Sequence, residues 1–319
     1  MSKTPSTLEE LVAPLGEAEF RSLLRERKLT LLRGAKADRY TGLLNWKMLR
    51  GMLERGEHPR DLIHLRLSRD SVKVPLERWF TKNPAGPGGK VDIAKVEAFL
   101  AQGFNLCITS IDENAPHLTK LCDDIRARSF ENIKIGVIVT TGKFGAFKLH
   151  YDPEDLVILQ VEGRKRWKIY GPAVLNPVID LPQPAPPPEE VPIFDEVLQP
   201  GDFLFVPGGN WHRCENGPGR SLHLGFFFLP PTSWHFIKAA MSDLVADAMI
   251  RTPLTRLSGP DELAALEADV KRRAIDTINR LNFAEYFAER IKARGSEGEC
   301  SSCAFGDRVR ISTNFAKSK

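Results

Sequence analysis

The sequence contains little cysteine, methionine or tyrosine and no long apolar run. Of its 319 residues, five are Cys, five are Met and four are Tyr. No stretch approaches the roughly 20 apolar residues of a membrane helix, and the opening segment MSKTPSTLEELVAPLGEAEF lacks the apolar stretch of a secretory signal. The net charge of +4 is mild, and no nucleic-acid-binding motif accompanies it. We therefore expect a cytoplasmic protein with no membrane segment and no specific nucleic-acid partner.

The cysteines do not define a zinc site. Cys107, Cys122 and Cys214 are scattered along the chain, as is typical of reduced thiols. Cys300 and Cys303 form a single CxxC in a Gly/Ser-rich tail, whereas a four-cysteine zinc site needs two such pairs. A structural or incidental role is favoured for this pair.

The apolar periodicity changes twice along the chain. Helical spacing predicts helices over 7–27, 45–56, 91–103 and 115–129, with strands over 28–34, 61–68 and 104–111. Strand-like runs follow, over 134–142, 147–152, 156–163, 165–172, 202–209 and 221–229. The helical period returns over 233–250, 260–281 and 283–294. We expect an N-terminal α/β region over 1–95 that packs on the core, a β core of sandwich or barrel type over 96–230, and a C-terminal helical module with a flexible tail over 231–319.

A proline-rich insertion interrupts the strand-like part. Seven prolines lie between Asn176 and Pro192, so this segment cannot form a central strand. A stiff surface connection over 177–192 is favoured, and a lid or a docking edge is the alternative.

Two short motifs carry candidate metal ligands. In HYDPEDLVILQVEGRKRW, His150 and Asp152 are two residues apart, and residues at this spacing on a strand face the same side. In QPGDFLFVPGGNWH, the Pro-Gly-Gly turn ends a strand and brings His212 back toward them. Two histidines and one carboxylate form the facial triad of non-haem Fe(II) oxygenases, which leaves open positions on the metal. A zinc hydrolase or isomerase can use the same ligands, but no candidate general base stands out.

A lysine beside these motifs favours the oxygenase. In KRWKIY, Lys165, Trp167 and Ile169 share one strand face, while Arg166, Lys168 and Tyr170 share the other. Lys165 therefore lies on the apolar side, and a buried lysine needs an anion. The distal carboxylate of 2-oxoglutarate, whose other end chelates the metal, is such an anion. The alternative is that Lys165 extends its ammonium out to solvent.

These motifs, with SLHLGFFF as a following core strand, resemble the JmjC/cupin-type oxygenases, close to the ribosomal-oxygenase and cupin-like branch. The resemblance extends over about residues 8–230 and implies a mainly β fold with flanking helices, built on a double-stranded β-helix (jelly roll). It implies that His150, Asp152 and His212 bind Fe(II), and that Lys165 and Thr140 bind the 2-oxoglutarate cosubstrate. The C-terminal helices resemble in position a helical dimerisation module, which implies a homodimer; closure of the chain's own core is the alternative.

The chain also departs from this family. Relatives often carry Asn and Tyr on the strand before the first ligand, where this sequence has Gly136 and Ile138. The serine that some relatives place late in the last core strand is an aromatic residue here, near Phe227. We interpret the metal site as intact and the cosubstrate pocket as altered.

The function implied by the resemblance is a dioxygenase that uses Fe(II), 2-oxoglutarate and O2 to hydroxylate a side chain of a protein or peptide. N-methyl-lysine demethylation and hydroxylation of a small molecule are alternatives of the same chemistry. A non-catalytic cupin-fold binding protein is an alternative of another class.

Two other residues have open roles. His223 is favoured as a satisfied core histidine over a fourth metal ligand. Asp155 either fixes a ligand imidazole or caps a turn.

Overall fold

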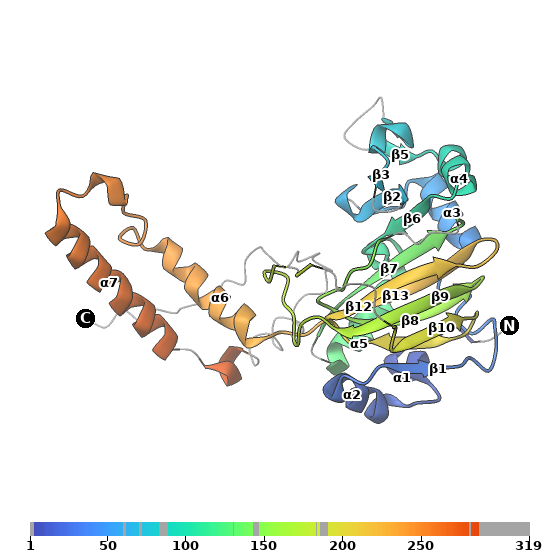
Figure 1. Ribbon diagram of the computed structural model, residues 1–319, viewed down its shortest axis with the longest axis horizontal. Coiled ribbons are helices and arrows are strands. Elements are labelled where there is room, and N and C mark those ends of the chain that lie inside the picture. The colour runs from blue at the N-terminus through green and yellow to red at the C-terminus, as the bar shows by residue number, and fades with distance from the viewer. Residues whose placement is uncertain are drawn as a thin grey trace. The chain divides into compact units, whose positions relative to one another are not determined.

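The computed structural model describes residues 3–59, 62–69, 72–82, 89–129, 131–142, 147–182, 184–185, 191–280 and 282–286. The chain divides into two compact units, Met1–Pro230 and Pro231–Lys319. Figure 1 shows the first unit as a β-rich body with helices and the second as a helical hairpin. The predicted boundary between an N-terminal region over 1–95 and the β core lies inside the first unit. That boundary stays a prediction.

The first unit is built on two antiparallel sheets. The large sheet has the strand order β1-β11-β8-β13-β7-β6-β2-β3, and the small sheet has the order β10-β9-β12. The large-sheet strands are β1 Thr30–Leu32, β2 Leu65–Arg69, β3 Val72–Lys73, β6 Asn105–Ile108, β7 Asn132–Thr140, β8 Asp155–Glu162, β11 Phe203–Val206 and β13 Ser221–Leu229. The small-sheet strands are β9 Lys165–Pro172, β10 Phe194–Leu198 and β12 Asn210–Asn216, and a separate pair joins β4 Phe80–Lys82 to β5 Gly89–Val91.

The chain passes back and forth between these sheets. It runs through β7 and β8 in the large sheet, β9 and β10 in the small sheet, β11 in the large, β12 in the small and β13 in the large. All these pairings are antiparallel. This path is that of a double-stranded β-helix, so the predicted fold class is confirmed.

Strand β8 shows why its sequence is almost continuously apolar. Val157, Leu159 and Val161 belong to the larger core, whereas Leu156 and Ile158 belong to a smaller core that also holds Trp167 and Ile169 of β9. Both faces of the strand are therefore buried, and no polar alternation is needed. The smaller core lies between the two sheets, where the candidate site residues also point.

The α-helices described in the first unit are α1 Leu8–Val12, α2 Glu17–Glu26, α3 Trp46–Arg55, α4 Ile93–Ala101 and α5 Pro116–Ser129. The helices bury their apolar faces in the larger core. Phe20 of α2, for example, lies edge-on to Phe203 and Phe205 at ring-centroid distances of 6.3 and 6.4 Å. One face of the large sheet therefore packs against the helices in the larger core, and its other face lines the space between the two sheets.

Several predicted elements differ from the structure. The single helix expected over 7–27 is two helices, because the chain turns at Pro14 and at Gly16, whose φ is 81°. The strand expected over 61–68 begins only at Leu65, after the 3₁₀ turn Leu62–His64. The strand expected over 147–152 is reduced to an isolated bridge at His150. Strands β10 and β12 were missed, since their exposed or polar residues hide the alternation.

The second unit contains α6 Ser233–Asp243 and α7 Pro260–Asn279, with 3₁₀ turns over Leu244–Ala246 and Leu254–Arg256. Thr232 and His235 form a capping box at the start of α6. No helix within the described ranges is long and apolar enough to cross a membrane. The Cys300–Cys303 pair, most of the predicted helix over 283–294 and part of the 177–192 insertion lie outside the described residues.

Candidate metal centre

His150 and His212 are brought together by a backbone pairing at the edge of the small sheet. The His150 N–H donates to the His212 carbonyl at 3.2 Å, and the His212 N–H donates to the His150 carbonyl at 2.7 Å. This isolated antiparallel bridge places the two imidazole rings 4.4 Å apart between centroids. Two motifs about 60 residues apart in the sequence therefore converge, as the pattern predicts.

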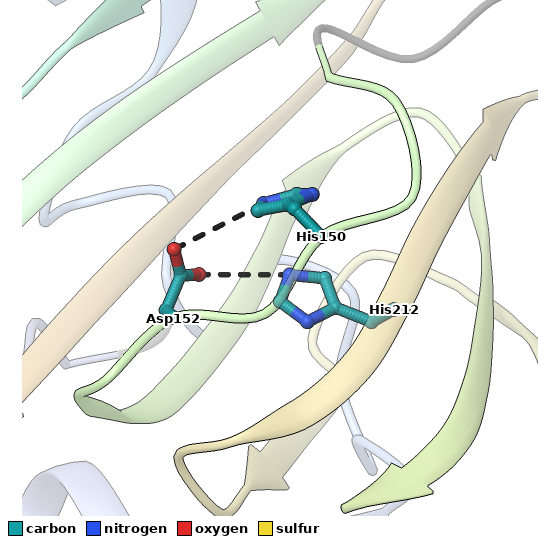
Figure 2. Close-up of side chains that lie close together, drawn as sticks. All are labelled: His150, Asp152 and His212. Atoms are coloured by element: carbon teal, nitrogen blue, oxygen red, sulfur yellow. Dashed lines mark ion pairs between the residues drawn. The ribbon is translucent and has the colours of Figure 1, made fainter. Parts of the chain in front are cut away.

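Asp152 completes the cluster. Its carboxylate lies 3.9 Å from His150 Nε2 and 3.5 Å from His212 Nε2. One potential ligand atom from each of the three residues lies within 4.8 Å of the others. Figure 2 shows the carboxylate directed toward both imidazoles. Such a set of one carboxylate and two nitrogen donors fits a divalent metal ion with open coordination positions.

Both imidazoles are oriented by carbonyl groups. His150 Nδ1 lies 2.7 Å from the Lys148 carbonyl, and His212 Nδ1 lies 3.0 Å from the Asn210 carbonyl. A carbonyl can only accept, so each Nδ1 donates, and Nε2 is the ring atom of each histidine that faces the cluster. Burial, and next the nearby His150, lower the pKa of His212 to about 4. His212 is thus neutral near pH 7, which is the state that binds a metal.

Asp155 fixes the turn that leads to His212. Its carboxylate accepts a hydrogen bond of 2.6 Å from the Gly208 N–H and lies 3.4 Å from the Arg27 guanidinium. Arg27 also donates to the Gly208 carbonyl at 2.6 Å. Of the two roles expected for Asp155, the structure therefore shows the turn cap, and the imidazoles are oriented by backbone carbonyls instead.

We predict that Asp155→Ala lowers the free energy of unfolding by about 1–3 kcal/mol, because the buried Gly208 N–H loses its acceptor. Urea denaturation of the metal-free protein measures this change. Asp195→Ala is the matched control: its ion pair with Arg166 is partly exposed, so it contributes less than about 1 kcal/mol. Equal losses for the two variants contradict the role of Asp155.

Lys165 is buried between the sheets without a counter-ion. Its residue is 2% exposed, and within the described part of the chain no carboxylate pairs with its ammonium. Burial lowers the pKa of Lys165 from its ordinary value, and the nearby Cys214 and Cys107 thiols oppose this shift. The alternative of an ammonium that reaches solvent is therefore wrong. A buried ammonium of this kind needs an anionic ligand.

Thr140 lies at the same end of the space between the sheets. Its hydroxyl donates to Asn216 Oδ1 at 3.0 Å, and Asn216 is the register partner of Lys165. The structure thus brings Thr140, Asn216 and Lys165 to one end of the site. Asn216 was not identified from the sequence, because the strand that carries it was missed.

Trp167 and His223 are the other side chains that the sequence did not assign to the site. Trp167 stacks on His212 at 5.6 Å with an interplanar angle of 28°, and meets His223 edge-on at 5.7 Å. His223 does not belong to the metal-ligand cluster. It is not a fully satisfied core histidine either, since its Nδ1 has no hydrogen-bond partner among the described residues.

The architecture and the cluster together define the cupin class: two facing antiparallel sheets with a two-histidine, one-carboxylate set at one edge. Residues 112–236 match the family model described as the JmjC domain. This range contains all five site residues predicted from the sequence, including Lys165 and Thr140. This match confirms the expected resemblance of the chain to the JmjC/cupin-type oxygenases.

The chain is similar over much of its length to curated ribosomal oxygenases. Ribosomal oxygenase 1 of Homo sapiens is 29% identical over 246 residues, which cover 76% of this chain and 37% of the relative. The bifunctional lysine-specific demethylase and histidyl-hydroxylase of Culex quinquefasciatus is 29% identical over 222 residues, which cover 68% of this chain and 33% of the relative. The chain spans 24–40% of the length of the curated relatives it matches.

One solved structure to which the chain is similar is that of YcfD, a ribosomal oxygenase from Escherichia coli. It is 16% identical, covers 85% of this chain and 70% of its own chain, and has a TM-score of 0.49. The same protein has been solved in complex with cobalt and 2-oxoglutarate, at 16% identity and a TM-score of 0.48, with 85% of this chain and 70% of that chain covered.

Proposed function

We propose that this chain is an Fe(II)- and 2-oxoglutarate-dependent dioxygenase that hydroxylates a side chain of a protein, with a ribosomal protein as the first candidate. The observation that carries the proposal is a facial metal-ligand set beside the buried ammonium of Lys165, which has no carboxylate partner in the part of the chain that the structure describes. Relatives named ribosomal oxygenase and histidyl-hydroxylase support a protein substrate. A cytoplasmic setting is part of the proposal.

The residues present fit the implied cofactors. Asp152 with Nε2 of His150 and His212 would hold Fe(II), and Lys165 would bind the distal carboxylate of 2-oxoglutarate near Thr140 and Asn216. When bound, Fe(II), 2-oxoglutarate and O2 supply an oxidation that releases succinate and CO2 and places one oxygen atom in a C–H bond of the substrate. The protein's own part is to orient both imidazoles, to keep His212 neutral and to bind the cosubstrate's charge in a dry site.

The direct test incubates the protein with Fe(II), 2-oxoglutarate, O2 and a mixture of ribosomal proteins. We expect succinate in proportion to a gain of one oxygen atom on a ribosomal protein, detected by peptide mass spectrometry, with no gain when 2-oxoglutarate is omitted. A loss of methyl groups from lysine instead supports the demethylase, an activity in the names of relatives. Absence of succinate together with tight 2-oxoglutarate binding supports the non-catalytic cupin-fold protein.

We also propose a homodimer through the C-terminal helices. Over its twenty residues α7 has no buried side chain, and Ile275 and Ile278 are 56% and 50% exposed. An apolar groove formed by α6 and α7 is lined by Trp234, Ile237, Met241, Val245 and Val270, among others. A helix pair with this much exposed apolar surface is typical of a protein–protein interface. A second copy of the chain could bury the same surface on both partners in a symmetric dimer.

For this dimer we predict that Ile237→Glu halves the molar mass measured by size-exclusion chromatography with light scattering, because a carboxylate in an apolar interface is strongly unfavourable. Ile63→Glu is the matched control, since Ile63 is 78% exposed on the first unit, and the variant should keep the wild-type mass. A monomeric wild-type protein at all concentrations, or an unchanged mass for Ile237→Glu, contradicts the proposal.

A further inference from the structure

Two buried N–H-bearing rings in the space between the sheets lack hydrogen-bond partners. Trp167 Nε1 and His223 Nδ1 have none among the described residues, and each residue is 3% exposed. A buried polar atom left unpaired costs about 1–3 kcal/mol, and such atoms are few in native proteins. The ammonium of Lys165, which has no carboxylate partner among the described residues, shares a strand face with Trp167 and lies in the same region.

The directions of the two rings follow from the strands that carry them. Trp167 shares its face of β9 with Lys165, and its ring meets both His212 and His223. His223 lies on β13 between Leu222 and Leu224, which point into the larger core. Since side chains alternate along a strand, His223 points the other way, into the space between the sheets. The indole therefore contacts a proposed iron ligand on one side and His223 on the other.

A third unmet atom distinguishes the kind of ligand. Gln160 Oε1 also lacks a partner, while Gln160 Nε2 donates to Ser221 Oγ at 2.9 Å. An amide oxygen only accepts, so it suits a donor such as the Lys165 ammonium or a water. The indole N–H only donates, and neutral His223 donates from Nδ1 in one of its tautomers. Two ring donors beside an ammonium match the lone pairs of a carboxylate.

We infer that Trp167 and His223 are further cosubstrate-binding residues of this chain: with Lys165 they bind the carboxylate end of 2-oxoglutarate, through the indole N–H and through Nδ1. This inference rests on the proposed function. Trp167 of β9 and His223 of β13 would then make the polar contacts that Gly136 and Ile138 of β7 cannot make. Neither Gly136 nor Ile138 has a hydrogen-bonding side-chain group. Ile138 is the register partner of His223, so the two positions lie side by side.

The test is an oxygen-free calorimetric titration of the Mn(II)-loaded protein with 2-oxoglutarate. Trp167→Phe keeps a ring on His212 and removes the N–H, and His223→Leu removes Nδ1. Each should weaken binding about tenfold, the effect of one hydrogen bond to a charged group. His223→Asn restores a donor near the Nδ1 position and should bind within about threefold of wild type, whereas His223→Gln, whose amide lies farther out, should not.

The outcomes separate the inference from the function on which it rests. Wild-type protein that does not bind 2-oxoglutarate overturns both. Wild-type binding that is unchanged in Trp167→Phe and His223→Leu overturns the inference alone and shows that waters satisfy the two rings. Thermal melting of the ligand-free protein checks for a merely structural role. Because no hydrogen bond of Nδ1 is lost, His223→Leu should keep the wild-type Tm, and a large decrease overturns the inference.

Discussion

Replacement of His212 by alanine reduces 2-oxoglutarate turnover below about one per cent of the wild-type rate. Loss of an outer partner of a metal ligand already costs about 10–100-fold in metal affinity or activity, and His212 is proposed as a ligand itself. Its Nε2 lies 3.5 Å from Asp152, and its ring lies 4.4 Å from that of His150. The alanine variant leaves one imidazole and one carboxylate, too few to hold Fe(II) firmly. Succinate formation measures turnover, and Mn(II) binding followed by electron paramagnetic resonance measures the site directly.

His117→Ala is the control for this loss. His117 lies on α5, and its Nε2 hydrogen-bonds to the Leu43 carbonyl at 2.6 Å, away from the metal cluster. This variant should keep most of the turnover and all of the Mn(II) binding. If His212→Ala binds Mn(II) as wild type does, the metal centre has been assigned to the wrong residues, whatever happens to activity.

Lys165→Met has two opposite effects. We expect 2-oxoglutarate affinity to fall by about a hundredfold, because the charge-assisted bond to the distal carboxylate is lost. The ligand-free protein should become more stable, by about 1–3 kcal/mol, since a buried and unpaired polar group is replaced by an apolar chain of similar length. Calorimetry measures the first effect and urea denaturation the second. A variant that loses stability and keeps its affinity contradicts the burial of an unpaired ammonium.

The same substitution changes the pH dependence of stability. Burial lowers the pKa of Lys165 below its ordinary value of 10.5. Across the window between the lowered pKa and 10.5, the unfolded chain binds more protons at this group than the folded protein does. The contribution of Lys165 to the free energy of unfolding therefore rises with pH in that window and is at its lowest below it. Comparison of wild type and Lys165→Met at a series of pH values should show this rise in the wild type alone.

Strand alternation accounts for what could be predicted of the site. The assignment of Lys165, Trp167 and Ile169 to one face of a strand is confirmed by their burial, while Arg166 on the opposite face is exposed. His150 and Asp152 also lie close together, but the strand on which this prediction rested is only a bridge at His150. The strand-face assignment succeeded because the side-chain period of two is a property of the backbone and needs no tertiary information.

The remaining parts of the site depend on contacts that the sequence does not display. The pairing of His150 with His212 is a single bridge outside any regular strand, so no alternating run marks it. The Asn216 contact with Thr140 joins residues 76 positions apart. The unmet Nδ1 of His223 depends on which neighbours happen to face it, which only the packed structure decides. The local sequence pattern was enough to predict which side chains share a strand face. The site itself depends on pairings between residues far apart in the sequence.

The ring of Phe227 and two glycines of neighbouring strands form one steric unit. Gly136 and Gly225 lie directly opposite each other on β7 and β13. A Cβ on Gly136 would come within 2.9 Å of the Phe227 ring, and one on Gly225 within 3.3 Å. The two differences from the family, at Gly136 and near Phe227, therefore depend on each other. The space between β7 and β13 can hold either a side chain at position 136 or the aromatic ring at position 227, but not both. Among homologous sequences these positions should covary. A side chain added at position 136 alone should clash with the Phe227 ring, and a smaller residue at 227 should relieve the clash.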